Sequence, residues 1–430
     1  MKRLILGAAA AALLAPPLAA QTVAIQGGKV YTMTGAPIEN GTVVIRDGKI
    51  LAVGAGVAVP AGATVIDARG KVVTPGLFDS ETQMGLSEVD AVEATNDFNA
   101  QGEQPGVPRD YVTAAFNVAA GINPGSIVIP VTRIAGVTTV VSAPTGGLVA
   151  GQGVVIDLSG ERLGDLLVKA PVAMFASVGE ASMAAGGGAR AGELLRLREL
   201  LDDARFYARN RAAFDRGESR ALAESRLDLE ALQPVLQGTL PLAVEVHRAS
   251  DIRNVLGLAR EYGLKLILVG ATEGWMVADE IAQARVPVVL KVLQNLPASF
   301  ERLGARYDNA AILRRHGVKI AITPNDTHNS RNITQEAGNA VAYGLPYDEA
   351  LRAITRSPAE IWGVADHGSL APGQVADVVV WSGDPLELLT SVEHVLIAGR
   401  EIPLTSRQTE LRDRYRDPAS TRRAYPGGGD

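Results

Sequence analysis

Short apolar runs separated by glycine turns occupy both ends of the chain. Two such runs flank Asp47-Gly48, a pair typical of a tight turn, and they predict a β-hairpin. The same pattern of short apolar runs and turns recurs between residues 376 and 402. Because chain termini usually lie close together, we predict that residues 21–74 and 368–403 pack together as one discontinuous β-sandwich.

The long middle of the chain alternates strand-like runs with helix-like segments. Residues 252–262 carry apolar side chains at helical spacing and end at Gly263, and strand-like runs stand on either side at 242–246 and 264–269. Repeated alternation of this kind is the signature of βα units around a parallel sheet. We therefore predict an α/β fold with a (β/α)8 barrel over residues 75–367. An open doubly wound sheet is the alternative, although no glycine-rich phosphate fingerprint opens any unit.

Six segments of this region are expected to be barrel strands: residues 77–79, 137–142, 242–246, 264–269, 286–290 and 318–322. The last four are expected to be the fifth to eighth strands. Residues 85–125 are polar and predict a long loop after the first strand. A charged helical segment near 182–232 predicts an exposed insertion or lid, and residues 404–430 predict a charged tail.

The first residues of the chain have the layout of a secretory signal peptide. Lys2 and Arg3 precede an apolar run that reaches Leu14, and small residues follow as far as Ala20. The apolar run is shorter than the roughly 20 residues that a membrane span needs. We expect residues 1–20 to be removed and the protein to be exported, periplasmic or secreted, with no membrane span after cleavage.

Composition and charge exclude several classes of function. The net charge of −6 and the pI near 5.6 argue against nucleic-acid binding. The chain has no Cys, which excludes thiolate metal sites, thiol nucleophiles and disulfides. Hydrophobic residues make up 47% of the chain and charged residues 20%, which is typical of a globular protein stabilised by its core.

The stretch 73–83 contains an apolar run, a break at Pro75-Gly76 and a second short apolar run. Two polar side chains, Glu81 and Gln83, then follow at a spacing of two. In an extended segment that spacing places both side chains on one face. We interpret the stretch as the first barrel strand, with both side chains directed to the active-site mouth.

Three separated motifs resemble the amidohydrolase superfamily, and within it the imidazolonepropionase-like and dihydroorotase-like branch: residues 47–50 (Asp-Gly-Lys-Ile), 70–79 (Gly-Lys-Val-Val-Thr-Pro-Gly-Leu-Phe-Asp) and 368–377 (Gly-Ser-Leu-Ala-Pro-Gly-Gln-Val-Ala-Asp). Residues 350–363 are similar to the family's helix that returns the chain from barrel to sandwich. The resemblance covers nearly all of residues 22–402. It implies a metal-dependent barrel hydrolase that cleaves carbon–nitrogen bonds in amides or cyclic amides.

The resemblance also implies a metal site at the barrel mouth. Such enzymes hold a divalent ion through a His-x-His pair after strand one, a His after strands five and six, and an Asp after strand eight. The ion lowers the pKa of a bound water, and the Asp takes the water's proton. The matching positions here are occupied by Glu81, Gln83, His247, Gly270 and Asn325, with Asp326 next to the last. We therefore expect no intact metal site. Glu81, Gln83, His247 and Asn325 remain as vestigial positions for one divalent ion at most, Zn²⁺ or another.

The candidate catalytic residues are His247, Asp326 and Glu81. His247 ends the fifth strand at the predicted mouth, where it is a candidate ligand or base. Asp326 is the candidate general base, one residue from the position of the family's Asp. Because a shift of one residue turns a strand-end side chain to the other face, Asp326 is alternatively the cap of a turn. Glu81 and Gln83 offer oxygen donors that suit a hard cation such as Mg²⁺ or Ca²⁺, or they hydrogen-bond to each other and to water.

The candidate substrate-binding residues are His328, Arg331 and Gln83. His328 and Arg331 share one loop, where they bind a substrate carboxylate or anchor the loop itself. Lys291 follows the seventh strand, where its charge either faces the cavity or is solvated. No role is expected for the other histidines, His316, His367 and His394.

Three functions fit these residues, each with a small-molecule substrate or ligand. The first is an exported hydrolase of small amide, cyclic imide or peptide-like substrates, with one metal or none. The second is a catalytically silent barrel that binds a small molecule or joins an intact relative in a hetero-oligomer; a homo-oligomer is also open. The third is a metal-free enzyme whose acid–base pair is Glu245 and His247, which project from one strand to one face.

Overall fold

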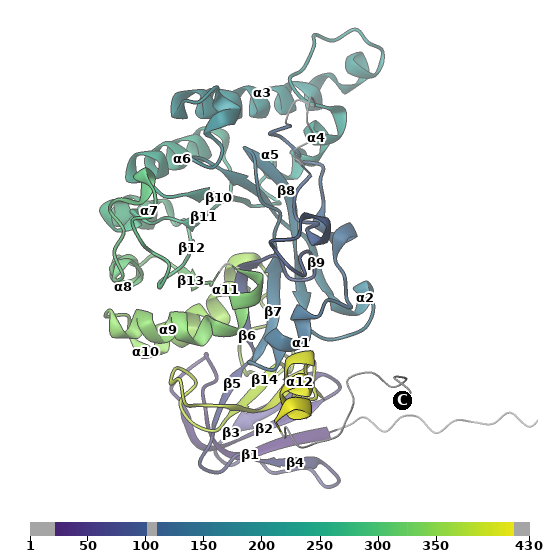
Figure 1. Ribbon diagram of the computed structural model, residues 1–430, viewed down its shortest axis with the longest axis vertical. Coiled ribbons are helices and arrows are strands. Elements are labelled where there is room, and N and C mark those ends of the chain that lie inside the picture. The colour runs from purple at the N-terminus through teal and green to yellow at the C-terminus, as the bar shows by residue number, and fades with distance from the viewer. Residues whose placement is uncertain (1–21, 101–109, 325, 417–430) are drawn as a thin grey trace, which may run out of the picture.

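Strands from both ends of the chain form one sheet in the computed structural model, which describes residues 22–100, 110–324 and 326–416 (Figure 1). The expected signal peptide, residues 1–20, and the end of the expected tail, residues 417–430, lie outside the described residues. The strands of this sheet are β1 (Thr22–Val30), β2 (Ile38–Arg46), β3 (Lys49–Gly54), β4 (Thr64–Asp67), β5 (Val72–Pro75), β14 (Val378–Trp381), β15 (Val392–Ile397) and β16 (Arg400–Glu401).

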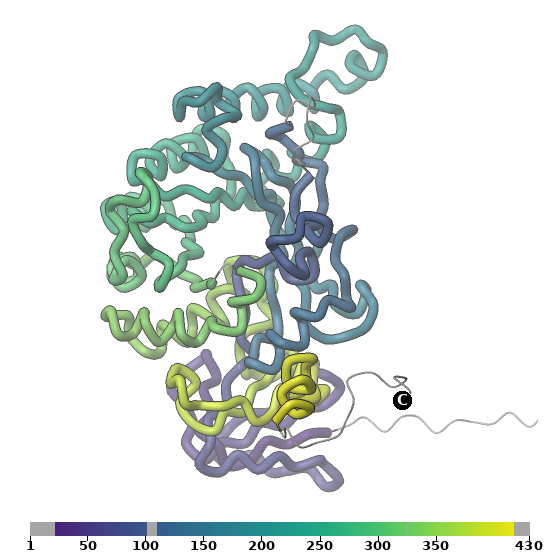
Figure 2. The backbone as a smooth tube through the Cα atoms, viewed as in Figure 1, coloured from purple at the N-terminus to yellow at the C-terminus, as the bar shows by residue number. Residues whose placement is uncertain are grey.

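The sheet divides at β1 and folds over a core of its own. β1 pairs with β2 on one side, and on the other side it runs parallel first to β4 and then to β5. β5 and β14 pair antiparallel, which joins the N-terminal strands to the C-terminal ones. Apolar side chains from both ends, among them Ile45 and Leu396, fill the core between the layers. The predicted β-sandwich is confirmed, and Figure 2 shows its purple and yellow segments interleaved below the barrel.

The predicted hairpin at Asp47-Gly48 connects β2 and β3. Arg46 and Lys49 are cross-strand partners, so the turn has only two residues. Both of them adopt positive φ angles, +52° at Asp47 and +76° at Gly48. Turns of this shape match the twist of the flanking strands, which is why an Asp-Gly pair favours them.

The second sheet contains eight strands and forms a nearly closed barrel. Neighbouring strands in the sheet follow chain order, as in a (β/α)8 barrel. The strands are β6 (Leu77–Thr82), β7 (Val137–Ser142), β8 (Val149–Asp157), β9 (Leu167–Ser177), β10 (Leu242–Val246), β11 (Leu266–Gly270), β12 (Val288–Leu290) and β13 (Ile320–Ile322). The predicted α/β barrel with a separate β-sandwich is confirmed.

One barrel strand departs from the expected parallel arrangement. β8 is antiparallel to both of its neighbours, β7 and β9. Only residues 143–148 separate β7 from β8, which is too short for a crossover helix and suits a hairpin instead. The end of β8 at Asp157 therefore lies at the opposite end of the barrel from the carboxyl ends of the parallel strands.

Helices cover the outside of the barrel (Figure 1). The α-helices are α1 (Val128–Arg133), α2 (Leu163–Leu166), α3 (Arg190–Asp215), α4 (Arg226–Ala231), α5 (Gln233–Leu236), α6 (Ala249–Tyr262), α7 (Ala278–Ala284), α8 (Asn309–Arg315), α9 (Ile333–Ala342), α10 (Tyr347–Ala353), α11 (Arg356–Trp362) and α12 (Arg407–Tyr415). Short 3-10 helices are η1 (Glu93–Thr95), η2 (Val118–Gly121), η3 (Met183–Gly186), η4 (Gly274–Val277), η5 (Phe300–Arg302) and η6 (Thr327–Asn332). Across the described residues, no helix is both long and apolar enough to span a membrane.

The segment near 182–232 is helical, as expected, but much of it is not an exposed lid. Leu197, Leu200 and Leu201 of α3 are buried in the main core together with residues of the barrel. α3 therefore serves as the barrel helix that follows the fourth strand. Most of the charged residues that suggested an exposed insertion, such as Glu199 and Asp202, occupy its solvent side, whereas Asp203 is buried.

Polar contacts connect the first and last barrel strands. Thr323, directly after β13, places its Oγ1 2.6 Å from Asp79 Oδ1 and 2.9 Å from the carbonyl oxygen of Glu81, both in β6. Ser330 Oγ donates to Asp79 Oδ2 at 2.6 Å. Asp79 is fully buried, and burial raises its pKa to about 6 although these hydroxyl groups act in the opposite direction.

The buried Asp79 predicts a specific pH dependence of stability. Its pKa is higher in the folded protein than in the unfolded chain, so its contribution is fully present below the unfolded value near 4 and declines as the pH rises through about 6. The Asp79→Asn variant cannot titrate there. Its free energy of unfolding, measured in urea, should fall less between pH 4 and pH 7 than that of the wild type, by roughly 2–3 kcal/mol.

The exposed Asp97 provides the control. Asp97→Asn should follow the wild-type curve, because this side chain lies at the surface. Parallel curves for Asp79→Asn and the wild type would contradict the assigned pKa.

Candidate active site

The carboxyl ends of the parallel barrel strands surround a small cavity. It measures about 20 Å³, which is room for one water molecule. Its lining residues are Glu81, Glu245, His247, Val269, Gly270, Thr272, Val289, Leu290, Lys291, Gln294, Asn295, Arg302 and Thr323. The barrel below is filled with apolar side chains, so chemistry in this barrel is confined to the mouth.

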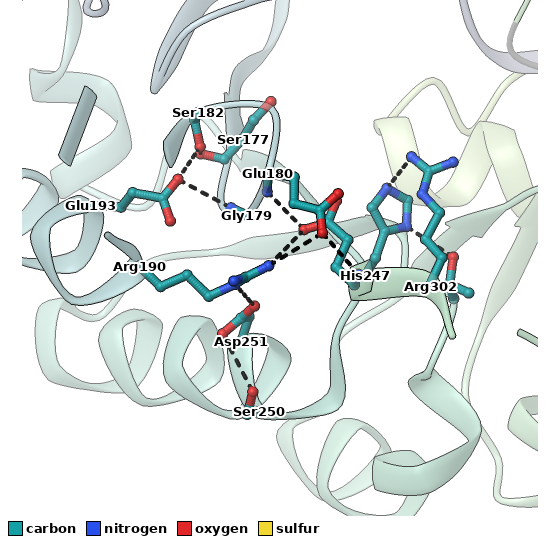
Figure 3. A network of polar contacts seen from close by, with 12 residues as sticks. Ser177, Gly179, Glu180, Ser182, Arg190, Glu193, His247, Ser250, Asp251 and Arg302 are labelled. Carbon is teal, nitrogen blue, oxygen red and sulfur yellow. Dashed lines mark hydrogen bonds and ion pairs between the residues drawn. The ribbon is translucent and has the colours of Figure 1, made fainter. Parts of the chain in front are cut away.

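His247 lies at the centre of the cavity lining and both of its ring nitrogens are engaged. Nδ1 lies 2.9 Å from Thr272 Oγ1, and Nε2 lies 2.7 Å from the Nη2 atom of Arg302 (Figure 3). A guanidinium is always a donor, so Nε2 accepts this hydrogen bond. The ring proton is therefore on Nδ1, where Thr272 Oγ1 accepts it.

Glu245 stands beside His247 on the same face of β10. Its Oε1 lies 3.3 Å from His247 Nε2 and 3.7 Å from Arg302 Nη2. Burial acts to raise the pKa of Glu245, but the positive charges around it, those of Arg302 and Lys291 among them, contribute to holding it below its ordinary value. Residues two apart on a strand project to the same face, so the sequence predicts that Glu245 and His247 lie side by side.

Arg302 is held over the mouth by an ion-pair network around the preceding residue. Glu301 Oε2 accepts from the backbone N–H of Glu180 at 2.7 Å, and Glu180 Oε1 accepts from the backbone N–H of Glu301 at 3.0 Å. Arg190 pairs with Glu301 at 3.5 Å and with Asp251 at 2.9 Å (Figure 3). These contacts fix η5 against the segments that follow the fourth and fifth barrel strands, and the side chain of Arg302 points at the imidazole.

Buried carboxylates anchor the same loop at both ends. Glu336 Oε2 accepts from the backbone N–H groups of Val292 and Leu293 at 2.7 and 2.8 Å. Glu273 Oε1 accepts from the backbone N–H of Gly304 at 3.1 Å. The position of Arg302 is thus fixed by contacts outside the cavity as well as inside it.

The residues at this mouth do not fit the family's metal ion. Gly270, where the family has its strand-six His, has a φ of +82°, and a Cβ atom there would lie 2.4 Å from His247 Cε1. No imidazole can be placed at position 270 without displacing His247. The nitrogen of His247 that would bind an ion already accepts from Arg302. The guanidinium of Arg302, which is permanently positive, thus faces the side chain that would have to bind a metal ion.

Of the two side chains expected to share a face on the first strand, only Glu81 reaches the cavity. Glu81 is buried and is part of the lining. Gln83, the residue directly after β6, is not part of it. The structure therefore places Glu81, and not Gln83, in the cavity lining.

Asp326 lies outside the cavity lining. Its Oδ2 accepts from the side-chain amides of Gln294 at 3.1 Å and Asn329 at 3.0 Å. Burial acts to raise the pKa of Asp326, but these amide donors bring it below its ordinary value. These contacts suit Asp326 as a residue that stabilises a turn better than as a general base. Asn325 lies outside the described residues.

His328 and Arg331 also lie away from the cavity. The His328 side chain is 66% exposed, and its Nδ1 lies 3.7 Å from Asp90 Oδ2. Arg331 donates to Gln408 Oε1 of α12 at 3.1 Å. Both side chains connect surface segments, which matches the alternative of a loop anchor and not that of substrate binding.

Comparison with known proteins identifies the family. The profile of the amidohydrolase family matches residues 330–403. An imidazolonepropionase from Mesorhizobium japonicum is 24% identical over 404 residues, which cover 82% of this chain and 89% of that protein. The crystal structure of an amidohydrolase from Thermotoga maritima MSB8 matches with a TM-score of 0.80 and 28% identity, over 89% of this chain and 99% of that one. The chain belongs to the amidohydrolase superfamily. The same comparisons support a hydrolase acting on carbon–nitrogen bonds.

A further relative of this amidohydrolase-family chain is longer than the chain itself. The amidohydrolase tasK of Hapsidospora irregularis is 22% identical over 393 residues, which cover 84% of this chain but 39% of that protein.

Sequence reasoning missed two residues of the site, Arg302 and Thr272. Arg302 stands in a loop without a recognisable motif, and only the folded chain brings it to His247. Thr272 offered a weak signal, since it lies two residues after the position of the family's strand-six His. Lys291, in contrast, lines the cavity, which is one of the two alternatives given for it above. Its Nζ lies 3.4 Å from Gln294 Oε1.

Substitution of Gly270 tests how tightly the imidazole is enclosed. Gly270→Ala combines the strain of a left-handed residue, about 1–2 kcal/mol, with a collision against His247. Gly263→Ala is the matched control, because its φ is +70° and its Cβ would meet nothing within 4 Å. Urea unfolding should show Gly270→Ala to be the more destabilised variant, by about 1–3 kcal/mol. Equal destabilisation would show that the ring is free to move.

Proposed function

We propose that this chain is an amidohydrolase-family enzyme that hydrolyses small amides or cyclic amides without a metal ion, using Arg302 as its cation. The observation that carries the proposal is the hydrogen bond of 2.7 Å from Arg302 to His247 Nε2, with Thr272 holding Nδ1. Support for the reaction class comes from relatives such as the imidazolonepropionase of Mesorhizobium japonicum.

His247 is suited to act as the general base of this reaction. With its proton fixed on Nδ1 by Thr272, the imidazole presents the lone pair of Nε2 to the cavity. Once a substrate oxygen has replaced Nε2 as the acceptor of the hydrogen bond from Arg302, Nε2 can accept a proton from the attacking water. Glu245, at 3.3 Å from Nε2, stabilises the imidazolium that forms.

Arg302 is suited to stabilise the oxygen of the substrate carbonyl as it becomes negative. Its Nε–H is buried and, among the described residues, has no acceptor. A guanidinium held in place at a small cavity acts as a preorganised donor to such an oxygen. The water oxygen bonds to the carbonyl carbon, the carbon–nitrogen bond breaks, and the imidazolium returns its proton to the leaving nitrogen. The products are a carboxylic acid and an amine.

A second candidate function is a silent barrel that binds a small molecule or supports an intact relative in an oligomer. The observation in its favour is that Arg302 satisfies Nε2 and leaves only about 20 Å³ of open volume. A substrate can enter only if this loop moves. For either function we propose that the protein is exported, on the pattern of residues 1–20.

A screen of amides, lactams and cyclic imides with EDTA-treated protein tests the proposed function. We expect turnover that is insensitive to EDTA and to added Zn²⁺, because no step uses a metal. His247→Ala should lower kcat at least about 100-fold through loss of the general base. His316→Ala is the control, since this exposed histidine pairs with Asp279 and does not line the cavity.

Arg302→Gln separates the two candidate functions. In an enzyme it should lower kcat about 100-fold or more, and Arg306→Gln on the same loop should not. Binding of screened compounds, with no turnover by any variant, would establish the silent barrel instead. Turnover that appears only with Zn²⁺, or that survives in His247→Ala, would refute the assigned mechanism.

A further inference from the structure

Two carboxylates and an imidazole meet at the other end of the barrel, where the sandwich adjoins it. Asp157 ends β8, Asp377 directly precedes β14, and His367 lies in the connection between α11 and β14. β8 is antiparallel to its neighbours, so its last residue lies at the amino ends of the parallel strands. Figure 1 shows β14 and β5 directly below β6 and β7 at this junction.

The three side chains are buried and converge on one point. Asp157, His367 and Asp377 are 9%, 5% and 3% exposed. One donor atom from each, a carboxylate oxygen or a ring nitrogen, lies within 4.8 Å of the other two. Thr139 Oγ1 lies 2.8 Å from Asp157 Oδ1 and 3.3 Å from Asp377 Oδ2, so both carboxylates flank one hydroxyl group.

The orientation of His367 is that of a metal ligand. Its Nδ1 lies 2.9 Å from Asp366 Oδ1, and metal-binding histidines commonly donate their second ring N–H to a carboxylate in this way. A neutral His367 that donates from Nδ1 to Asp366 presents the lone pair of Nε2 to Asp157 and Asp377. A lone pair directed at two carboxylates is repulsive unless a cation lies between them.

The separation of the donor atoms also suits a shared ion. Nε2 of His367 lies 3.5 Å from Asp157 Oδ2. A charge-assisted N–H···O hydrogen bond is shorter, about 2.7–2.9 Å. Two ligands bound to one tetrahedral ion at about 2.0–2.1 Å stand roughly 3.4 Å apart, which is close to the observed separation.

The charge of the cluster calls for a cation. Asp157 and Asp377 are buried together, and within the described ranges neither forms an ion pair with a Lys or an Arg. Buried charges are normally paired or coordinate a metal. Among the described residues, His367 is the basic side chain that pairs with Asp157 and lies beside Asp377.

We propose that Asp157, His367 and Asp377 form a structural site for a divalent transition metal, with Zn²⁺ as the ion that best matches one nitrogen and two oxygen donors. The ion would join the barrel, through Asp157, to the sandwich, through Asp377. The site is separate from the mouth and does not depend on the function proposed for His247.

Zinc binding by the full-length protein tests the site. Protein stripped with EDTA and dialysed is titrated with ZnCl₂, and bound zinc and the Tm are measured. We expect one equivalent of Zn²⁺ and a Tm that rises by several degrees, since an ion that binds the folded state stabilises it. His367→Gln and Asp377→Asn should lose both effects. His247→Gln at the mouth and His394→Gln, a surface residue of the sandwich, should retain them.

Co²⁺ bound to the wild type gives a readout that does not depend on the folding of any variant. One equivalent of Co²⁺, displaced by Zn²⁺, with X-ray absorption showing one imidazole among nitrogen and oxygen ligands, is expected. Three results would overturn the site: wild-type protein that binds less than about a tenth of an equivalent of Zn²⁺, binding that survives in His367→Gln, or binding that disappears in His247→Gln. The first of these would show instead that His367 is protonated and ion-paired with Asp157.

Discussion

The hydrogen bond from the Arg302 guanidinium to His247 Nε2 determines what the barrel mouth can do. It places a permanent positive charge against the nitrogen that would bind a metal, and it leaves Nδ1 to donate to Thr272. The loop contacts make this bond possible, since Glu301 next to Arg302 is held by the backbone N–H of Glu180. From the other side Gly270 leaves just enough space for the ring. The mouth is therefore built around a resident guanidinium.

In this arrangement the resting site and the reaction use the same two groups, Arg302 and His247 Nε2, in different ways. In the resting site Arg302 satisfies the lone pair of Nε2, and the imidazole cannot accept a proton from water while that bond persists. A substrate oxygen that accepts from Arg302 would release Nε2 at the moment when a base is needed. In so small a cavity electrostatic interactions are stronger than in water, so the exchange of partners matters to both binding and rate. The same geometry explains why a ligand that leaves Arg302 in place would be bound and not hydrolysed.

The fold was predictable because it rests on local patterns, whereas the site rests on contacts between distant residues. Apolar periodicity and Asp47-Gly48 were sufficient for the sandwich and the barrel, and a spacing of two was sufficient to place Glu245 beside His247. The same spacing did not bring Gln83 into the cavity lining beside Glu81. Arg302 stands 55 residues from His247 and is directed there by a loop anchored at several points, which no motif reveals. His367 was given no role because it stands in a helix-end or turn context in the sequence, and only the folded chain places it beside Asp157 at the end of β8.

A zinc-edge anomalous difference map from crystals grown with ZnCl₂ tests the central claim most directly. The claim is that Arg302, and not a metal, is the cation that faces His247. The expected map has no peak beside His247 Nε2, and the guanidinium remains within hydrogen-bond distance of that nitrogen. A peak about 2.0–2.1 Å from Nε2, with Arg302 displaced, would show that the mouth is a metal site after all and would contradict the account.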